Sequence, residues 1–114
     1  MNIQKWLFLL LLLSPTHAIA TGGEWNGVGV IKTMFIYPTS AVIIQGNSWQ
    51  GTAGCTNNDG WSFNWSQFDL PTQARIQSML LSAYVSKTPI QVAIHQTGCG
   101  PEGRKNFNGQ IMLP

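Results

Sequence analysis

The two cysteines, Cys55 and Cys99, limit the fold of this chain more than any other feature of its sequence. In an oxidising compartment they allow a single pairing, a disulfide that closes a loop of about forty residues. A domain of this size buries only about 60 to 68% of the surface that its unfolded chain exposes, so its stability margin is thin. The cross-link is expected to contribute about 4 kcal/mol. A reactive thiol is the alternative, and it would need a partner base and a reducing compartment.

The first twenty residues indicate the compartment. Lys5 gives the start a positive charge, and residues 6–13 form an unbroken apolar run. Ala18-Ile19-Ala20 then supplies small residues at alternate positions, the pattern of a signal-peptidase site. We therefore expect a signal peptide over residues 1–20 and a single disulfide-stapled domain over residues 21–114, secreted or periplasmic and without a membrane span. An uncleaved anchor is the alternative, but the apolar run is too short to span a bilayer.

The charge of the expected domain excludes one class of partner. Residues 21–114 carry five basic and four acidic side chains, so the net charge is only +1. Basic residues this few and this scattered cannot neutralise a run of phosphates, and nucleic-acid binding is excluded. The many Gly, Asn, Ser and Thr residues indicate a globular domain whose surface is polar but largely uncharged.

Hydrophobic periodicity predicts strands before and after one helix. Two β-branched runs flank the turn signal Pro38-Thr39-Ser40 and predict an antiparallel hairpin. Further along, aromatic residues alternate with small polar ones, which places Trp61, Phe63 and Trp65 on one face of a strand. The predicted strands cover residues 28–37, 41–45, 61–66, 90–95 and 107–113, and a short one is expected near Cys55.

One helix is predicted over about residues 70–87. Asp69 can cap it, Pro71 is tolerated in its first turn, and Pro89 forces it to end. Its apolar face is expected to carry Ile76, Met79, Leu80, Ala83 and Tyr84. The fold class is therefore α+β: a small OB-like, partly open antiparallel β-barrel of five or six strands, with the helix closing one end or face. A flat sheet with a helix on one side is the alternative.

Catalysis and metal binding find little support among the polar residues. The expected domain has one histidine, His95, and four scattered carboxylates, and no acid and base are paired in the sequence. No second ligand lies at a helical or hairpin spacing from His95, so neither a zinc site nor a cofactor is expected. We predict that the protein is not an enzyme, with His95 a surface or rim residue. A small hydrolase that uses His95 as its base is the alternative.

The aromatic residues are better candidates for function. Sugar rings present apolar C–H faces that stack on Trp or Tyr, while their hydroxyls bond to Asn, Gln and Ser. Trp49 lies in a polar loop and is the first choice for ligand binding, followed by Tyr37 and Trp25. Whether the aromatic strand of residues 61–66 fills the core or faces a ligand is left open.

Three segments carry a family resemblance. They are GVGVIKTMFIYPTSAVIIQG over residues 27–46, LPTQARIQSMLLSAYVSKTPIQVAI over 70–94 and NGQIMLP over 108–114. In the pattern of hairpin, helix and last strand they resemble small exported bacterial proteins similar to the B subunits of subtilase cytotoxin and its pertussis-like relatives. The resemblance implies an OB-like fold, assembly into a ring of five and recognition of cell-surface sugars. The polar cluster that holds sialic acid in those subunits has no counterpart residue for residue, so no site residue is carried over.

The sequence thus leads to the expectation of a secreted, non-catalytic binding protein, a glycan-binding oligomer similar to toxin B subunits. The alternative is an exported protein that works alone and binds or inhibits another protein. The outer face of the helix carries Ser78, Ser82 and Ser86, which suits either a neighbouring subunit or solvent.

Overall fold

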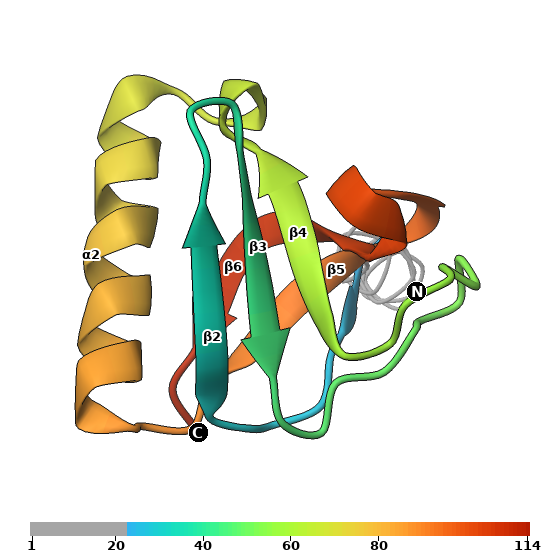
Figure 1. The fold of residues 1–114 in the computed structure, drawn as a ribbon, viewed down its shortest axis with the longest axis horizontal. Helices are drawn as coiled ribbons and strands as arrows, with labels where there is room; N and C mark the ends of the chain where they lie inside the picture. Colours follow the sequence, from blue (N-terminus) through green and yellow to red (C-terminus); the bar gives the residue numbers. More distant parts are fainter. Residues whose placement is uncertain (1–22) are drawn as a thin grey trace, which may run out of the picture.

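The computed structural model describes residues 23–114, and the signal peptide predicted for residues 1–20 lies outside that part of the chain. Figure 1 shows strands that twist across one another with one α-helix standing beside them. The described elements are β1 (Gly23–Trp25), β2 (Ile31–Ile36), β3 (Ser40–Gln45), β4 (Gly60–Asn64), α2 (Leu70–Ser86), β5 (Gln91–Cys99) and β6 (Lys105–Met112), with short 3₁₀ turns at Trp65–Gln67 and Pro101–Gly103. The α+β class is confirmed, with α2 the only α-helix in the described residues.

The six strands form one mixed sheet in the order β1-β5-β6-β4-β3-β2. The predicted antiparallel arrangement is wrong for one pairing, because β4 and β6 are parallel. The edge strands β1 and β2 are not paired with each other, so the sheet is not closed. The register between β5 and β6 breaks twice, and such breaks bend long strands. The bent β6 meets β4 over only two residue pairs, beginning with Trp61 opposite Lys105.

The segment 26–30 connects the two open edges of the sheet. Gly29 exchanges two backbone hydrogen bonds with Ile90, just before β5, with N···O distances of 3.0 and 2.9 Å. On the other side, the Gly46 N–H donates to the Val30 carbonyl at 3.0 Å. A Cβ on Gly29 would lie 1.9 Å from the Gly46 carbonyl oxygen, so only glycine permits this approach. The segment thus holds β5 and the end of β3 near each other although no ladder closes the sheet.

The buried side chain of Gln45 joins this segment to the core. Its Nε2 lies 3.2 Å from the Gly27 carbonyl oxygen, 3.1 Å from that of Gly29 and 2.9 Å from that of Ile90. Its Oε1 accepts a hydrogen bond of 2.7 Å from the indole Nε1 of Trp61. One amide therefore satisfies polar groups from three separate stretches of chain in a place that water does not reach, since Gln45 is 2% exposed.

The predicted β2–β3 hairpin is confirmed. Met34 pairs with Ile43, and the Tyr37 N–H closes the turn by donating to the Ser40 carbonyl at 2.8 Å. β2 is shorter than predicted because residues 28–30 leave the hairpin for the connection to β5.

The helix also follows its local signals. Asp69 caps it, with Oδ1 accepting from the Thr72 N–H at 2.9 Å, and Lys87 ends it in a left-handed conformation with φ of 55°. Ile76, Leu80 and Ala83 are buried against the sheet. Met79 and Tyr84, predicted on the same face, flank it and are exposed, because the helix contacts the sheet along a narrow stripe.

The aromatic residues of 61–66 fill the core. Trp61 and Phe63 are fully buried, and the ring of Phe107 packs at centroid distances of 4.7 and 5.2 Å from them. Trp65 was predicted in the strand, but it begins a 3₁₀ turn; its ring is still buried and meets Phe63 edge to face at 4.8 Å. These three residues therefore belong to the core and do not form a binding surface, which answers the question that the sequence leaves open.

The opposite side of that strand is covered as well. Ser62 is fully buried, and its hydroxyl donates to the Pro101 carbonyl at 2.8 Å. The 3₁₀ turn Pro101–Gly103 covers this side of β4. A short-range pattern cannot reveal a cover that comes from a loop forty residues away.

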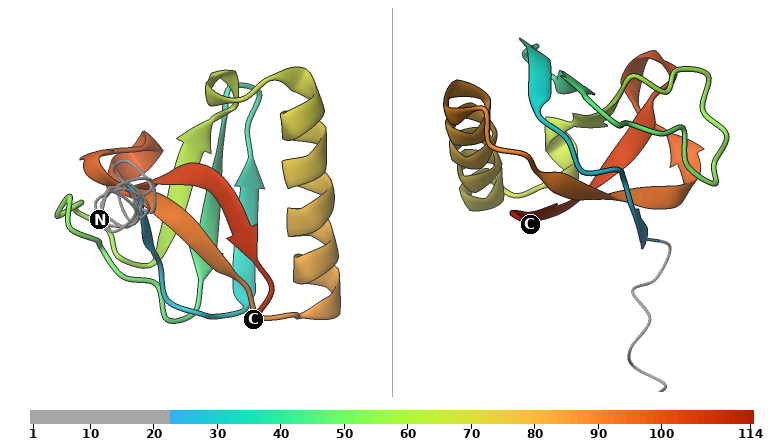
Figure 2. Two further views of the ribbon diagram at one scale, coloured as in Figure 1. Left: turned by 180° about the vertical axis from the view of Figure 1, so that it is seen from behind. Right: turned by 90° about the horizontal axis from the view of Figure 1, so that it is seen from below.

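The predicted disulfide is confirmed between Cys55 and Cys99, with the Cα atoms 5.9 Å apart. It ties the loop 46–59 to the end of β5. Figure 2 shows that this loop, drawn in green, lies on the opposite side of the molecule from α2. The cross-link therefore stabilises the end of the molecule that the helix does not support.

Candidate functional site

Two of the three predicted ligand-binding residues have backbones near each other at the end of the sheet beside loop 46–59. Trp25 is in β1 and Trp49 is in the loop, and each is 44% exposed. The backbone N–H of Trp49 donates to Oδ1 of Asn26, the residue next to Trp25, at 3.1 Å. Glu24 and Asn26 both bond to the loop, so the side chain of Trp25, which lies between them in the strand, points to the opposite face from the loop.

Asn26 is itself held firmly. It is 1% exposed, and its backbone N–H donates to the Val92 carbonyl of β5 at 2.8 Å. Its carbonyl accepts from Gln91 Nε2 at 2.8 Å, and its side-chain Nδ2 donates to the Ser48 hydroxyl at 3.4 Å. The amide that positions Trp49 is therefore anchored to the sheet.

Loop 46–59 has a second attachment at Glu24 of β1. Both carboxylate oxygens of Glu24 accept hydrogen bonds of 2.6 Å from Thr52, one from the backbone N–H and one from the hydroxyl. Between these anchors Gly51 adopts a left-handed φ of 73°, and a Cβ there would lie 3.0 Å from the Glu24 Oε1 and 3.1 Å from the Ile94 Cδ1. The loop consequently packs closely on the sheet around Gly51.

A buried lysine lies under the same loop. Lys105 of β6 is 1% exposed, and its Nζ donates to the Ser48 hydroxyl at 2.6 Å. Burial lowers the pKa of Lys105 to about 8; the Asp59 carboxylate opposes this shift and the Arg104 guanidinium adds to it.

The carboxylate of Asp59 is already engaged. Arg104 donates two hydrogen bonds to it, from Nε to Oδ1 at 2.8 Å and from Nη2 to Oδ2 at 3.0 Å. Its Nη1 also lies 3.1 Å from Oε1 of Glu102. The hydrogen bond from Arg104 lowers the pKa of Asp59 below its usual value. These two ion pairs of Arg104 are the ones formed within residues 23–114, so no acid there pairs directly with Lys105.

Tyr37, the remaining predicted residue, lies elsewhere. It follows β2 at the hairpin turn, where its ring stacks on Phe35 at a centroid distance of 6.3 Å. The full length of β3 separates this turn from loop 46–59, and Figure 1 places the two at opposite ends of that strand. The structure therefore brings the Trp49 backbone near β1, and Tyr37 lies apart from both tryptophans.

His95 lies on β5, where it pairs with Gly23 of the edge strand β1, and it is partly buried. Within residues 23–114, no three His, Cys, Asp or Glu side chains come together in a way that could hold a metal ion. No helix in this part of the chain is long and apolar enough to cross a membrane.

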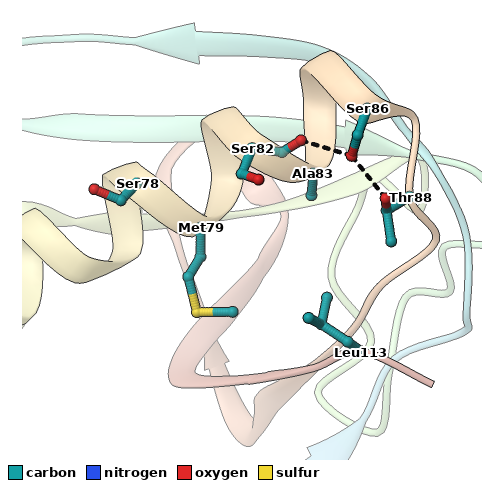
Figure 3. A pocket seen from close by; sticks show the side chains of 7 residues that line it. All are labelled: Ser78, Met79, Ser82, Ala83, Ser86, Thr88 and Leu113. Atoms are coloured by element: carbon teal, nitrogen blue, oxygen red, sulfur yellow. Dashed lines mark hydrogen bonds between the residues drawn. The ribbon is translucent and has the colours of Figure 1, made fainter.

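A second surface feature is a shallow hollow of about 210 Å³ on the outer side of α2. Figure 3 shows the hydroxyls of Ser78, Ser82, Ser86 and Thr88 above the apolar side chains of Met79 and Leu113. The Ser86 hydroxyl donates to the Ser82 carbonyl at 2.7 Å and lies 2.6 Å from the Thr88 hydroxyl. The hydroxyls of Ser86 and Thr88 are therefore already engaged, and the hollow offers fewer free polar groups than its composition suggests.

Sequence reasoning missed Asn26, Ser48 and Lys105. A signal existed for Lys105. Phe107, Gly109 and Ile111 lie on one face of the predicted strand because strand side chains alternate, and residue 105 continues the same spacing of two. No comparable signal exists for Asn26 and Ser48, whose contacts depend on the loop and β1 meeting in space.

No known family model matches the chain, and neither a curated protein nor a solved structure gives a significant match.

Proposed function

We propose that this protein is a glycan-binding protein whose ligand stacks on Trp49. The supporting observation is the exposure of this indole on an anchored loop: Trp49 is 44% exposed, and its backbone N–H bonds to the buried amide of Asn26. An aromatic ring held in place before binding loses little conformational entropy when a ligand stacks on it.

The surroundings of Trp49 suit a polyhydroxylated ligand. Asn47 and Gln50 are exposed in the same loop, and their side-chain nitrogens bond to the Val28 and Cys55 carbonyls, which fixes the amides and leaves their oxygens as acceptors. Amide and hydroxyl groups next to an aromatic face are the combination that sugars require, since sugars have apolar ring faces and polar edges.

The proposal extends to the fold family and the compartment. One helix beside a bent six-stranded sheet, with segment 26–30 bonded to Ile90 before β5 and to Gly46 after β3, supports an OB-like barrel that is incompletely closed. The disulfide supports export to an oxidising compartment, where such bonds persist. The proposal is thus a secreted binding protein of the kind that the resemblance to toxin B subunits implies.

Trp49→Ala should weaken glycan binding about tenfold, because it removes a stacking surface worth about 1.4 kcal/mol. Binding is measured on an array of sialylated and neutral glycans and then by calorimetry with the best ligand. Tyr84→Ala, which removes another exposed aromatic ring on α2, serves as the control and should bind normally. A wild-type protein retained by no glycan on the array would refute the proposal.

A second candidate function is binding of another protein, and the surface between β2 and α2 favours it. β2 is an edge strand with free backbone groups, and Ile36, Leu81 and Val85 beside it are 55%, 56% and 72% exposed. A hollow of about 180 Å³ separates the two elements, and Lys32 and Lys87 line the next hollow along the same boundary. The chemistry fits an extended segment with alternating apolar side chains and an acidic end.

Ile36→Lys separates the two candidates. A partner protein captured from envelope or culture extracts should be lost with Ile36→Lys and kept with Trp49→Ala if the β2 edge binds it. Native mass spectrometry tests assembly in the same samples: the glycan-binding ring implied by the resemblance should have five times the mass of the mature chain. Capture that Ile36→Lys leaves unchanged would remove the β2 edge from consideration.

A further inference from the structure

The contact between Ser48 and Lys105 has no role in the binding proposal. The two residues are 57 positions apart, and their side chains meet with Nζ and Oγ separated by 2.6 Å. Lysine is almost never fully buried unless a carboxylate accompanies it, yet here its direct partner is a hydroxyl. A buried amine against a serine is the arrangement that activates a nucleophile in serine–lysine hydrolases.

We propose that Ser48 is a nucleophile and Lys105 its general base, and that the pair accepts an acyl group from small carboxylic esters. The reaction adds chemistry to a protein for which binding alone is proposed above, and it does not rest on that proposal. Ser48 is partly exposed at the surface of loop 46–59, whereas the amine lies beneath it. The hydroxyl can therefore meet a substrate while the base stays out of water.

The environment of Lys105 raises the fraction of its neutral form, which is the form that can act as a base. Burial lowers the pKa of Lys105 to about 8, so about a tenth of the molecules carry the neutral amine at pH 7. The charged groups around it do not restore the ordinary value: Asp59 is held by Arg104, whose own positive charge opposes protonation of Lys105. Glu24, on β1, is occupied by Thr52.

The step itself balances. Ser48 Oγ attacks the carbonyl carbon of the ester as its proton passes to Lys105 Nζ, and the carbonyl π electrons move to oxygen. Collapse of the tetrahedral intermediate breaks the ester C–O bond, and the departing alkoxide takes the proton from Nζ. The products are acyl-Ser48, one alcohol and a neutral Lys105, and attack by water in the same manner releases the carboxylic acid.

Asn26 is placed to assist. Its Nδ2 lies 3.4 Å from Ser48 Oγ, and the bond from the Trp49 N–H to its Oδ1 fixes which end of the amide faces the serine. A donor oriented toward Oγ favours the deprotonated form of the serine and so eases removal of its proton. On the inner side the backbone of Gly51 lies close to the base, since a Cβ there would lie 3.6 Å from Lys105 Cδ. The acyl group must consequently lie on the solvent side of Ser48.

The probe is p-nitrophenyl acetate, with nitrophenol release and peptide mass spectrometry as the readouts. We expect a single acetyl group on Ser48 of the wild-type protein and none on Ser48→Ala. Ser82→Ala, which removes a serine from the exposed face of α2, should behave as wild type. Acetylation only at other residues, or unchanged nitrophenol release by Ser48→Ala, would overturn the proposal.

Lys105→Arg separates chemistry from structure. Arginine retains the positive charge and the hydrogen bond but cannot give up its proton, so the variant should fold and yet react about a hundredfold more slowly. The wild-type protein provides an independent test: its acetylation rate should rise with pH and level off above about 8. A rate independent of pH across that range, or a folded Lys105→Arg with the wild-type rate, would contradict the role of Lys105 as base.

Discussion

Replacing Gln45 with leucine should lower the free energy of unfolding by about 3 kcal/mol, even though the two side chains are close in size. The Trp61 indole N–H and the Gly27 carbonyl lose their partner, whereas the Gly29 and Ile90 carbonyls keep the backbone bonds that these two residues exchange. Each buried polar group that loses its partner costs about 1 to 3 kcal/mol, and part of that cost is recovered because leucine itself is apolar. Urea unfolding monitored by tryptophan fluorescence measures the change in midpoint at constant slope.

Gln110→Leu is the matched control for that experiment. It makes the same chemical change at an exposed position of β6 and should alter stability by less than about 0.5 kcal/mol. A Gln45→Leu protein as stable as Gln110→Leu would mean that the segment 26–30 does not depend on this amide.

Removal of the disulfide is the second large effect. The double variant Cys55→Ala/Cys99→Ala should lose about 4 kcal/mol, because the cross-link spans 44 residues and restricts the unfolded chain over that length. A loss of this size is a large share of the total stability of a small domain. Alanine is preferred to serine because Cys55 is buried and a hydroxyl there would need a new partner.

Wild-type protein unfolded in the presence of a reducing agent should match the double variant. The comparison separates the effect of the covalent bond from that of the lost sulfur atoms, since reduction keeps both thiols. If the reduced wild-type protein kept its full stability while the double variant lost it, packing of Cys55 would account for the loss and the cross-link would not.

The elements that the sequence predicts best are those set by neighbouring residues. Asp69, Pro71 and Pro89 define the helix through local backbone chemistry, and α2 ends within one residue of the predicted limit. The hairpin follows from its turn residues, and the disulfide from the count of two cysteines. Each of these predictions needs information from a few positions only.

The features that escaped prediction depend on contacts between distant segments. Gln45 ends a predicted strand, and it is buried because segment 26–30 passes over it. The parallel contact of β4 with β6 depends on how far the register breaks bend β6, which a period-two pattern does not encode. Of the candidate site, the exposure of Trp49 followed from the sequence, whereas the bond between its backbone and Asn26 did not.

The place of β1 in the sheet affects how the protein can be made. Although β1 comes first among the described strands, its partners lie on β5, with Glu24 opposite Ile94 about seventy residues later. A growing chain therefore holds this strand unpaired until nearly all of the protein has been synthesised, and contacts of such long range slow folding. The native fold can therefore form only in a chain that includes β5. In a fragment that stops before β5, the first strand has no partner strand.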